Sequence, residues 1–501
     1  PLATLKGDAR MAQVIARAAA DRERPLRADA TFLLDGLRIR FSRRDSARVV
    51  TQARRRRGTH NAKRLFLERR VLDVLVERYH GAATRSYRAS RLDAEQRGDP
   101  DGGELTLATV DPAIASALAR GESPPEDWSA ELRTRLRRRP EVHEILERIW
   151  PVLSGAELVN DLFGFRALVR SAAEGILAES EQELLHRARR SELDDAPWTD
   201  ADVALVDEAD ALLGPVEDAR PRRRVRHVDQ DALDSASAVI DELGLHGLTD
   251  AATLAQRYAD PGSSNGDGRS EPRTFGHVLV DEAQDLTAMQ WRMLARRCPS
   301  GSMTLVGDPG QASRPGALAA WSDILAHIPR QVPPRFANLT VNYRTPAEIM
   351  DVANRLLAVA APTVVPSASV RRVGIAPEFL AVANDARVRA AAHRVRAARA
   401  KTGTVAVIAP RALHDAFVAE LADLGAVADT VEALDAPVAV LDATDAKGLE
   451  FDHVVVVEPA RLVAPDRSGL RLLYVTITRA TKTLTVVHSE PLPEALVNVS
   501  R

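Results

Sequence analysis

The chain has 501 residues, of which 45% are hydrophobic and 28% are charged. This composition is typical of a globular protein with material for two or three hydrophobic cores, and it excludes fibrous and disordered classes. Lys and Arg total 68 against 70 Asp and Glu, so the net charge of −2 provides no overall attraction to nucleic acid.

Two further features limit the class of protein. The single cysteine, Cys298, excludes an intramolecular disulfide framework and a cysteine-based zinc cluster. No apolar run approaches the length of about 18 residues that crosses a bilayer, and the first residues lack a secretory signal pattern. We therefore expect a cytoplasmic protein with no membrane partner, and, since the sequence starts at Pro1, a gene product that extends upstream.

Residues 1–213 have helical periodicity, many charges and few strand-like runs. Clear examples are 64–79 and 141–150, and Ser154 with Glu157 has the spacing of a capping box that starts another helix. We predict a mainly helical region. Arginine clusters lie in and after this region, at 54–57, 133–139 and 220–226. They could bind phosphates or an acidic protein surface, although such clusters more often form solvated helix faces and loop ends.

Residues 214–274 combine a chain of acids with a Gly/Ser-rich stretch at 261–270. A segment this long with so little apolar periodicity is usually functional or disordered. We predict an acidic, flexible loop.

From about residue 275 the pattern changes to short β-branched runs that alternate with helical segments. Runs that are rich in Val on both faces are typical of buried parallel strands. We predict an α/β fold with strands at 277–281, 303–307, 339–342, 404–409, 438–443, 453–458 and 484–488.

The first of these strands ends in two adjacent carboxylates, Asp281 and Glu282. The first can hold Mg²⁺ and the second can orient an attacking water. Taken alone, an apolar run that ends in two acids has a structural role at least as often as a catalytic one. A similar pair, Asp207 and Glu208, follows another apolar run, but a cap at Thr199 or Asp200 and a stop at Gly214-Pro215 favour a structural helix over 200–213.

Four more motifs follow Asp281 and Glu282 in order. Strand 303–307 is followed by a glycine turn that carries Gln311, which can reach a γ-phosphate. Strand 339–342 leads into Tyr343 and Arg344, and the last two motifs are the segments 445–452 and 473–480. Any one of these could be chance, but five in this order are not.

The series resembles motifs II to VI of superfamily 1 helicases of the UvrD/Rep type, and it spans about 278–488. The resemblance implies RecA-like P-loop NTPase motor domains that bind ATP or GTP with Mg²⁺. Transferred by motif position, it implies that Asp281 holds Mg²⁺, Glu282 is the catalytic base and Gln311 senses the γ-phosphate. It also implies that Arg344 and Arg479 are arginine fingers. Tyr343 would stack on the nucleobase, and Glu450, close to Gly448, would contact the ribose. For Arg344 alone, the alternative is a surface ion pair.

Three departures from the helicase pattern matter as much as the matches. None of the five lysines follows a glycine, so the chain has no Gly-Lys-Ser/Thr phosphate-binding loop, and we expect that loop upstream; the alternative is an inactive site. Gln311 is followed by Ala-Ser-Arg-Pro-Gly, whereas the helicases have an aromatic residue there that stacks a single-stranded base. Finally, the interval from Arg344 to Lys447 is too short for the extra subdomain of Rep and UvrD.

The long helical region and the minimal second motor domain narrow the resemblance to the HelD family of helicase-like factors that bind bacterial RNA polymerase. It implies release of nucleic acid and recycling of the core polymerase by a monomeric ATPase, with nucleic acid displaced or weakly bound. The implied domains are a helical insertion at 1–213, a candidate primary-channel loop at 214–274, the rest of the first motor domain at 275–335, and the second motor domain at 336–501. A DNA translocase or helicase in repair, and an inert binding module, are the alternatives.

Overall fold

The computed structural model describes residues 1–97, 117, 126–216, 237, 273–318, 320–329, 332–430, 433, 435–464 and 466–497. The chain divides into two compact units, one formed mainly by Ala9–Arg273 and the other by Ala3–Asp8 with Thr274–Arg501. None of the helices in the described ranges has both the length and the apolar character needed to cross a membrane. Most of the acidic segment 214–274 and the arginine cluster 220–226 lie outside the described residues.

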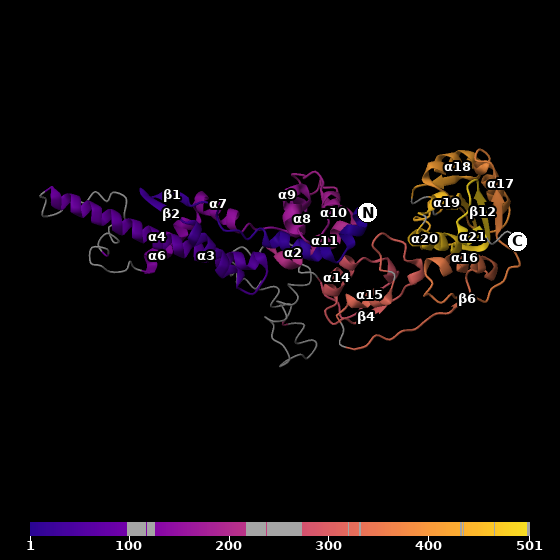
Figure 1. Ribbon diagram of the computed structural model, residues 1–501, viewed down its shortest axis with the longest axis horizontal. Helices are drawn as coiled ribbons and strands as arrows, with labels where there is room; N and C mark the ends of the chain where they lie inside the picture. The colour runs from indigo at the N-terminus through magenta and orange to yellow at the C-terminus, as the bar shows by residue number, and fades with distance from the viewer. Residues whose placement is uncertain are drawn as a thin grey trace. The chain divides into compact units, whose positions relative to one another are not determined.

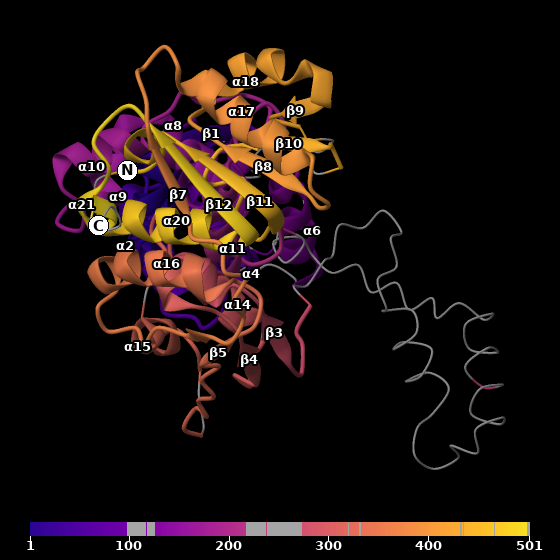
Figure 2. The ribbon, with the colours of Figure 1, turned by 90° about the vertical axis from the view of Figure 1, so that its right-hand side faces the viewer.

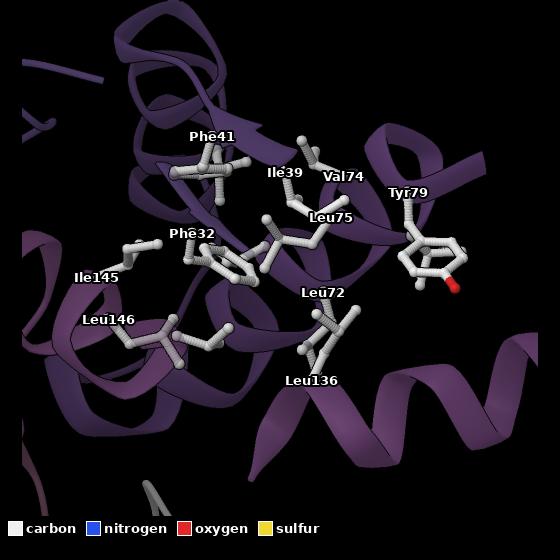
Figure 3. Close-up of a cluster of buried hydrophobic side chains, with 14 of the residues drawn as sticks. Phe32, Ile39, Phe41, Leu72, Val74, Leu75, Tyr79, Leu136, Ile145 and Leu146 are labelled. Atoms are coloured by element: carbon white, nitrogen blue, oxygen red, sulfur yellow. The ribbon is translucent and has the colours of Figure 1, made fainter. Parts of the chain in front are cut away.

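The first unit, Ala9–Arg273, begins with a helix and a β-hairpin that packs on a long helix (Figure 1). Its first core gathers apolar side chains from the hairpin and from the helices around it, including Phe32, Ile39 and Leu75 (Figure 3). The elements up to this point are α2 (Arg10–Ala20), β1 (Ala30–Leu34), β2 (Leu37–Phe41), α3 (Arg43–Arg54), α4 (His60–Gln96), α6 (Glu126–Arg137) and α7 (Pro140–Ile149).

The hairpin is a β element within the mainly helical region. Strands β1 and β2 pair antiparallel from Ala30 with Phe41 to Leu34 with Leu37. The turn residues Asp35 and Gly36 have φ angles of 49° and 72°. Positive φ at both central residues is the signature of the tight turn that matches strand twist, and Asp-Gly is one of its preferred sequences.

Replacing Gly36 with valine is expected to lower the free energy of unfolding by about 1–2 kcal/mol, because a β-branched residue is strained at this φ. Gly36→Asn is the matched control, and it should cost less because asparagine tolerates the left-handed region. Urea unfolding of the full chain measures both. Equal stability of the two variants would contradict this account of the turn.

A second group of helices completes this unit, with α11 packing on α2 and α8. Its members are α8 (Gly155–Gly164), α9 (Arg166–Ala173), α10 (Glu179–Leu185) and α11 (Asp200–Leu213). The predicted capping box is confirmed at α8, where Ser154 Oγ accepts from Glu157 N and Glu157 Oε2 accepts from Ser154 N.

The structural reading of 200–213 is also confirmed. These residues form helix α11, which starts after Thr199 and ends at Gly214 with φ 73°. Arg187 holds the segment before this helix: its guanidinium lies 5.5 Å from the Phe163 ring centre and 4.9 Å from that of Trp198, and it donates to Pro197 O and Asp202.

The arginines of 133–139 are engaged within their own unit. Arg133 donates to Asp73, Arg137 to Glu68, and Arg139 to Glu141. Arg135 pairs with Asp35 at the hairpin turn. For these four side chains the structure supports the reading as ion-paired helix surface rather than a phosphate-binding cluster.

The second unit starts with a small parallel pair, β3 (Val278–Val280) and β4 (Met303–Leu305). One face of this pair packs on Trp291 and Ile324, while Leu279 on the other face is 70% exposed. Nearby elements are α1 (Leu2–Gly7), the 3₁₀ helices η2 (Ala283–Asp285) and η3 (Pro309–Gln311), α14 (Ala288–Arg297), α15 (Trp321–Ala326), β5 (Val341–Asn342) and β6 (Ala368–Ser369).

The main sheet of this unit has six parallel strands in the order β7-β12-β11-β8-β10-β9, which confirms the α/β prediction. Helices α16 and α20 cover one face and α17 and α18 the other (Figure 2). Strand bounds are β7 (Glu378–Ala381), β8 (Val405–Ile408), β9 (Ala426–Ala428), β10 (Val438–Leu441), β11 (Phe451–Val457) and β12 (Ala480–His488). Helix bounds are α16 (Ala347–Ala360), α17 (Arg387–Arg399), α18 (His414–Glu420), α19 (Pro459–Leu462), α20 (Arg467–Thr478) and α21 (Glu494–Val497).

Candidate functional site

The two adjacent acids lie directly after β3, at the carboxyl end of the strand. Both residues are exposed. Asp281 Oδ1 accepts from the Glu282 backbone N–H at 2.9 Å. Glu282 has a left-handed backbone, φ 49° and ψ 39°, which is uncommon for a residue with a side chain and costs free energy. The two carboxylates therefore lie on a turn rather than on an extended strand.

A buried glutamine links this turn to the one after β4. Gln284 Nε2 donates to Glu282 Oε2 at 2.6 Å, and its Oε1 accepts from Asp308 N at 3.0 Å. A Cβ added at Gly307 would lie 2.3 Å from Gln284 Oε1. Glycine at 307 is thus required by the close approach of this amide, which fixes the direction of the Glu282 carboxylate.

Gln311 lies at the end of η3, and its side chain is held by an acid of the same turn. Its Nε2 donates to Asp308 Oδ2 at 3.0 Å, while Asp308 Oδ1 accepts from Gly310 N at 2.8 Å. The amide would have to exchange this bond to reach a phosphate.

Arg344 and Glu450 form an ion pair in which both side chains are 43% exposed. The Arg344 backbone N–H donates to Asn342 Oδ1, which fixes the turn after β5. Tyr343 beside it is 79% exposed, which leaves its ring face open for stacking. Gly448, with φ 81°, lies in the loop that leads to Glu450.

Arg479 is buried, with 4% of its surface exposed. Its guanidinium donates to the carbonyl oxygens of Val475 and Leu449 at 3.0 and 3.1 Å. Burial lowers the pKa of Arg479, the nearby Arg344 lowers it further, and the charges of Glu450, Glu282 and Tyr474 oppose that shift.

The electrostatics place four of the predicted site residues, Glu282, Arg344, Glu450 and Arg479, in one neighbourhood. Besides the groups that act on Arg479, burial and then the Asp308 carboxylate raise the pKa of Tyr474 to about 12, against the charges of Arg479 and Arg344. Glu282 after β3, Asp308 after β4 and the two arginines therefore lie in the same neighbourhood. Among the described residues, Asp281 makes no direct hydrogen bond to either arginine.

Lys447 is the site residue that the sequence did not single out. Its Nζ lies 2.7 Å from Asp285 and donates to Gln311 O at 2.7 Å and Ser313 Oγ at 3.2 Å. Its side chain is only 12% exposed and that of Asp285 only 8%. One buried cation thus joins the acid motif, the Gln311 motif and the loop before Glu450.

The loop that carries Lys447 is braced at its start by Asp442. Burial raises the pKa of this carboxyl, but bonds from the Thr444 hydroxyl, the Asp445 N–H and the Arg411 guanidinium outweigh it and lower the pKa to about 2. A carboxyl with a lowered folded-state pKa stabilises the fold above its unfolded value, near 3.8, and loses this effect as pH falls toward 2.

The free energy of unfolding of Asp442→Asn is therefore expected to lie below that of the parent chain at pH 6, with the gap closing between about pH 4 and 2. Urea titrations at a series of pH values measure the gap. Asp385→Asn, at an exposed carboxyl on the same unit, is the control and should show no such trend. A gap of constant size would contradict the assignment.

A metal ion in this region would need some of its coordinating oxygens from a bound molecule. Within the described ranges no group of three or more His, Cys, Asp and Glu side chains could hold a metal ion. Asp281 keeps one carboxylate oxygen beyond the bond to Glu282 N. Mg²⁺ in proteins is commonly bound by one or two carboxylates together with substrate phosphates. The donor set fits Mg²⁺ held between Asp281 and phosphate oxygens.

Comparison with known proteins gives two domain matches and one structural likeness. Residues 160–312 match the UvrD/REP helicase N-terminal domain, and residues 437–487 match the UvrD-like helicase C-terminal domain. Among solved structures, the C-terminal domain of a possible DNA helicase from Lactobacillus plantarum WCFS1 is 26% identical; the match covers 32% of this chain and 95% of that one, with a TM-score of 0.26. No curated protein matches the chain. The chain thus carries UvrD-like, superfamily 1 helicase N- and C-terminal domain sequences.

Proposed function

We propose that the chain belongs to a helicase-like ATPase that binds RNA polymerase and uses nucleotide-linked domain motion to release nucleic acid and recycle the enzyme. The observation that carries the ATPase part is the common neighbourhood of Glu282, Arg344, Glu450 and the buried Arg479. Phosphoryl transfer needs positioning and charge neutralisation, and carboxylates facing guanidinium groups supply both.

In this proposal Asp281 holds Mg²⁺ against the phosphates of ATP or GTP and Glu282 takes the proton of the attacking water. Gln311 and the two arginines contact the γ-phosphate, Tyr343 stacks on the base, and Glu450 contacts the ribose near Gly448. Arg344 would leave Glu450 when a nucleotide binds, since the two now neutralise each other.

The phosphate-binding loop would come from a segment outside the 501 residues. The exposed face of the β3–β4 pair supports this, because parallel strands are normally covered on both faces and Leu279 is 70% exposed. A further strand beside this pair would place a glycine-rich loop next to Asp281.

Polymerase remodelling is favoured over strand tracking by the segment after Gln311. Gln311 is followed by Ala-Ser-Arg-Pro-Gly, without the base-stacking aromatic of UvrD-type helicases, and Ser313 in this segment accepts hydrogen bonds from Lys447 Nζ at its hydroxyl and from Ser468 Oγ at its carbonyl. A stacking platform worth about 1–3 kcal/mol per base is thus not formed by this segment, which instead contacts Lys447 and Ser468.

The test compares core RNA polymerase binding with duplex unwinding, using the protein that includes the phosphate-binding loop. Retention by immobilised core polymerase, ATP-dependent release of bound DNA and no unwinding of a tailed duplex are expected. Glu282→Gln should still be retained but should not release DNA. Unwinding without polymerase binding would instead establish the repair helicase, and failure of both would overturn the proposal.

A further inference from the structure

The main sheet has a cavity on its α17 side that no part of the proposed function uses. Its volume is about 460 Å³, within the range of small-molecule sites. Helix α17 covers this face of the sheet, whereas α16 and α20 cover the other (Figure 2). Tyr474 of the candidate nucleotide site packs in the core on that opposite face.

One helical stripe forms the roof of the cavity. Arg394, Ala397, Ala398 and Lys401 line it, and their spacing of three, four and seven positions places them on one side of α17 and its end. The two alanines at the centre leave space beneath the helix, with a cation at each end.

The floor is more polar than the rest of the same face of the sheet. Along β11 and β12 this face continues in the core with Val457 and Val487, whereas at the cavity it carries His453 and Thr483 beside Val455. Thr485 adds another hydroxyl to the lining. Hydrogen-bonding side chains on a buried face cost free energy unless they have partners, and a polar ligand would supply such partners.

His453 carries a buried polar atom that lacks a partner. The residue is 3% exposed, its Nδ1 lies 2.8 Å from Thr483 Oγ1, and its Nε2 has no well-aligned hydrogen-bond partner among the described residues, although the Thr402 carbonyl lies close enough to raise the pKa of the ring. Burial lowers the pKa of His453, and the charge of Lys401 lowers it further, against the Thr402 carbonyl and Asp452, so the ring is neutral near pH 7. When the Thr483 hydroxyl donates to Nδ1, the Nε2–H remains to donate to a ligand oxygen.

The charge of the lining is positive overall. Arg394 forms an ion pair with Glu378, which also lines the cavity. Lys401 is exposed and has no ion pair among the described residues. A neutral pair and one uncompensated ammonium leave a net charge that favours an anion.

We propose that this cavity binds a small organic anion, a phosphate or carboxylate compound, with the anionic group between Lys401 and His453 and the body of the ligand under the two alanines of α17. The site is separate from the candidate nucleotide site, whose groups belong to the turns around Glu450 and Arg479 and to the opposite core.

The test is calorimetric titration of the full chain with inorganic pyrophosphate and, separately, with citrate. Lys401→Ala is expected to weaken binding about tenfold or more, since it removes the charged donor. Ala397→Leu, at an exposed lining position, should fill the cavity and abolish binding without disturbing the core. Thr485→Val removes one hydroxyl at nearly constant volume and should weaken binding. Arg389→Ala, on the exposed side of the same helix, is the matched control and should bind like the parent chain.

Binding of pyrophosphate alone would assign the site to phosphates, and binding of citrate alone to carboxylates. The proposal is overturned if neither anion binds at millimolar concentration, or if Lys401→Ala and Ala397→Leu bind like the parent chain. A signal that is lost in Arg344→Ala but kept in Lys401→Ala would belong to the nucleotide site and would also overturn it.

Discussion

Glu282→Gln is expected to lower the turnover number for ATP by about 10²- to 10⁴-fold, the usual contribution of a general base, in the protein that includes the phosphate-binding loop. The amide cannot accept the proton of the attacking water, yet it keeps the size and backbone of the parent residue. Asp281 remains available to the metal, so the dissociation constant for ATP should change little. Steady-state phosphate release and equilibrium binding of a fluorescent nucleotide measure the two quantities.

Glu490→Gln is the matched control for this substitution. Glu490 lies in the same unit and pairs with Arg461, outside the candidate site. Its turnover should stay within about twofold of the parent, a change of less than one RT unit of barrier height. Retained turnover in Glu282→Gln would show that another group is the base.

Lys447→Met is expected to lower the free energy of unfolding by about 3–5 kcal/mol, because it leaves the Asp285 carboxylate buried without its cation. Arg314, whose Nε lies 3.9 Å from Asp285 and which is 66% exposed, can compensate only in part. Urea unfolding of the full chain, followed by tryptophan fluorescence near Trp291, measures the loss.

A double-mutant cycle separates the ion pair from other effects of the methionine. The double variant, Lys447→Met with Asp285→Asn, should lose less unfolding free energy than the two single variants lose together, because no uncompensated charge remains. Additive losses would mean that Lys447 acts through Gln311 O and Ser313 alone.

The sequence predicts the strands of the main sheet well because they are buried on both faces. Runs such as 453–458 and 438–443 contain almost continuous valine and alanine, and strands β11 and β10 overlap them. The edge strands β7 and β9 were not predicted. Each is short and only partly buried, so neither needs an apolar run.

The β1–β2 hairpin was missed although a signal was present. Asp35-Gly36 stands between alternating apolar and polar residues, and this pattern predicts a two-residue hairpin turn. The helical periodicity of the surrounding residues is the longer signal, whereas the turn signal spans two residues.

The candidate site was predictable only where its residues lie in local motifs. Asp281, Glu282 and Arg344 follow strands, so their positions at strand ends could be read from the chain. The contact of Lys447 with Asp285 joins residues 162 positions apart, and although both lie in motif segments, no local pattern shows that they meet. Likewise, the burial of Arg479 depends on the packing of α20 against β11 and β12, which no local pattern encodes.

The position of Arg187 between two aromatic rings limits which side chains this site tolerates. A flat cation can stack on Phe163 and Trp198 while its edge bonds to Pro197 O and Asp202, but an ammonium group on a flexible stem cannot do both. Only five of the 68 basic residues of the chain are lysines. At position 187 the side-chain geometry itself requires an arginine.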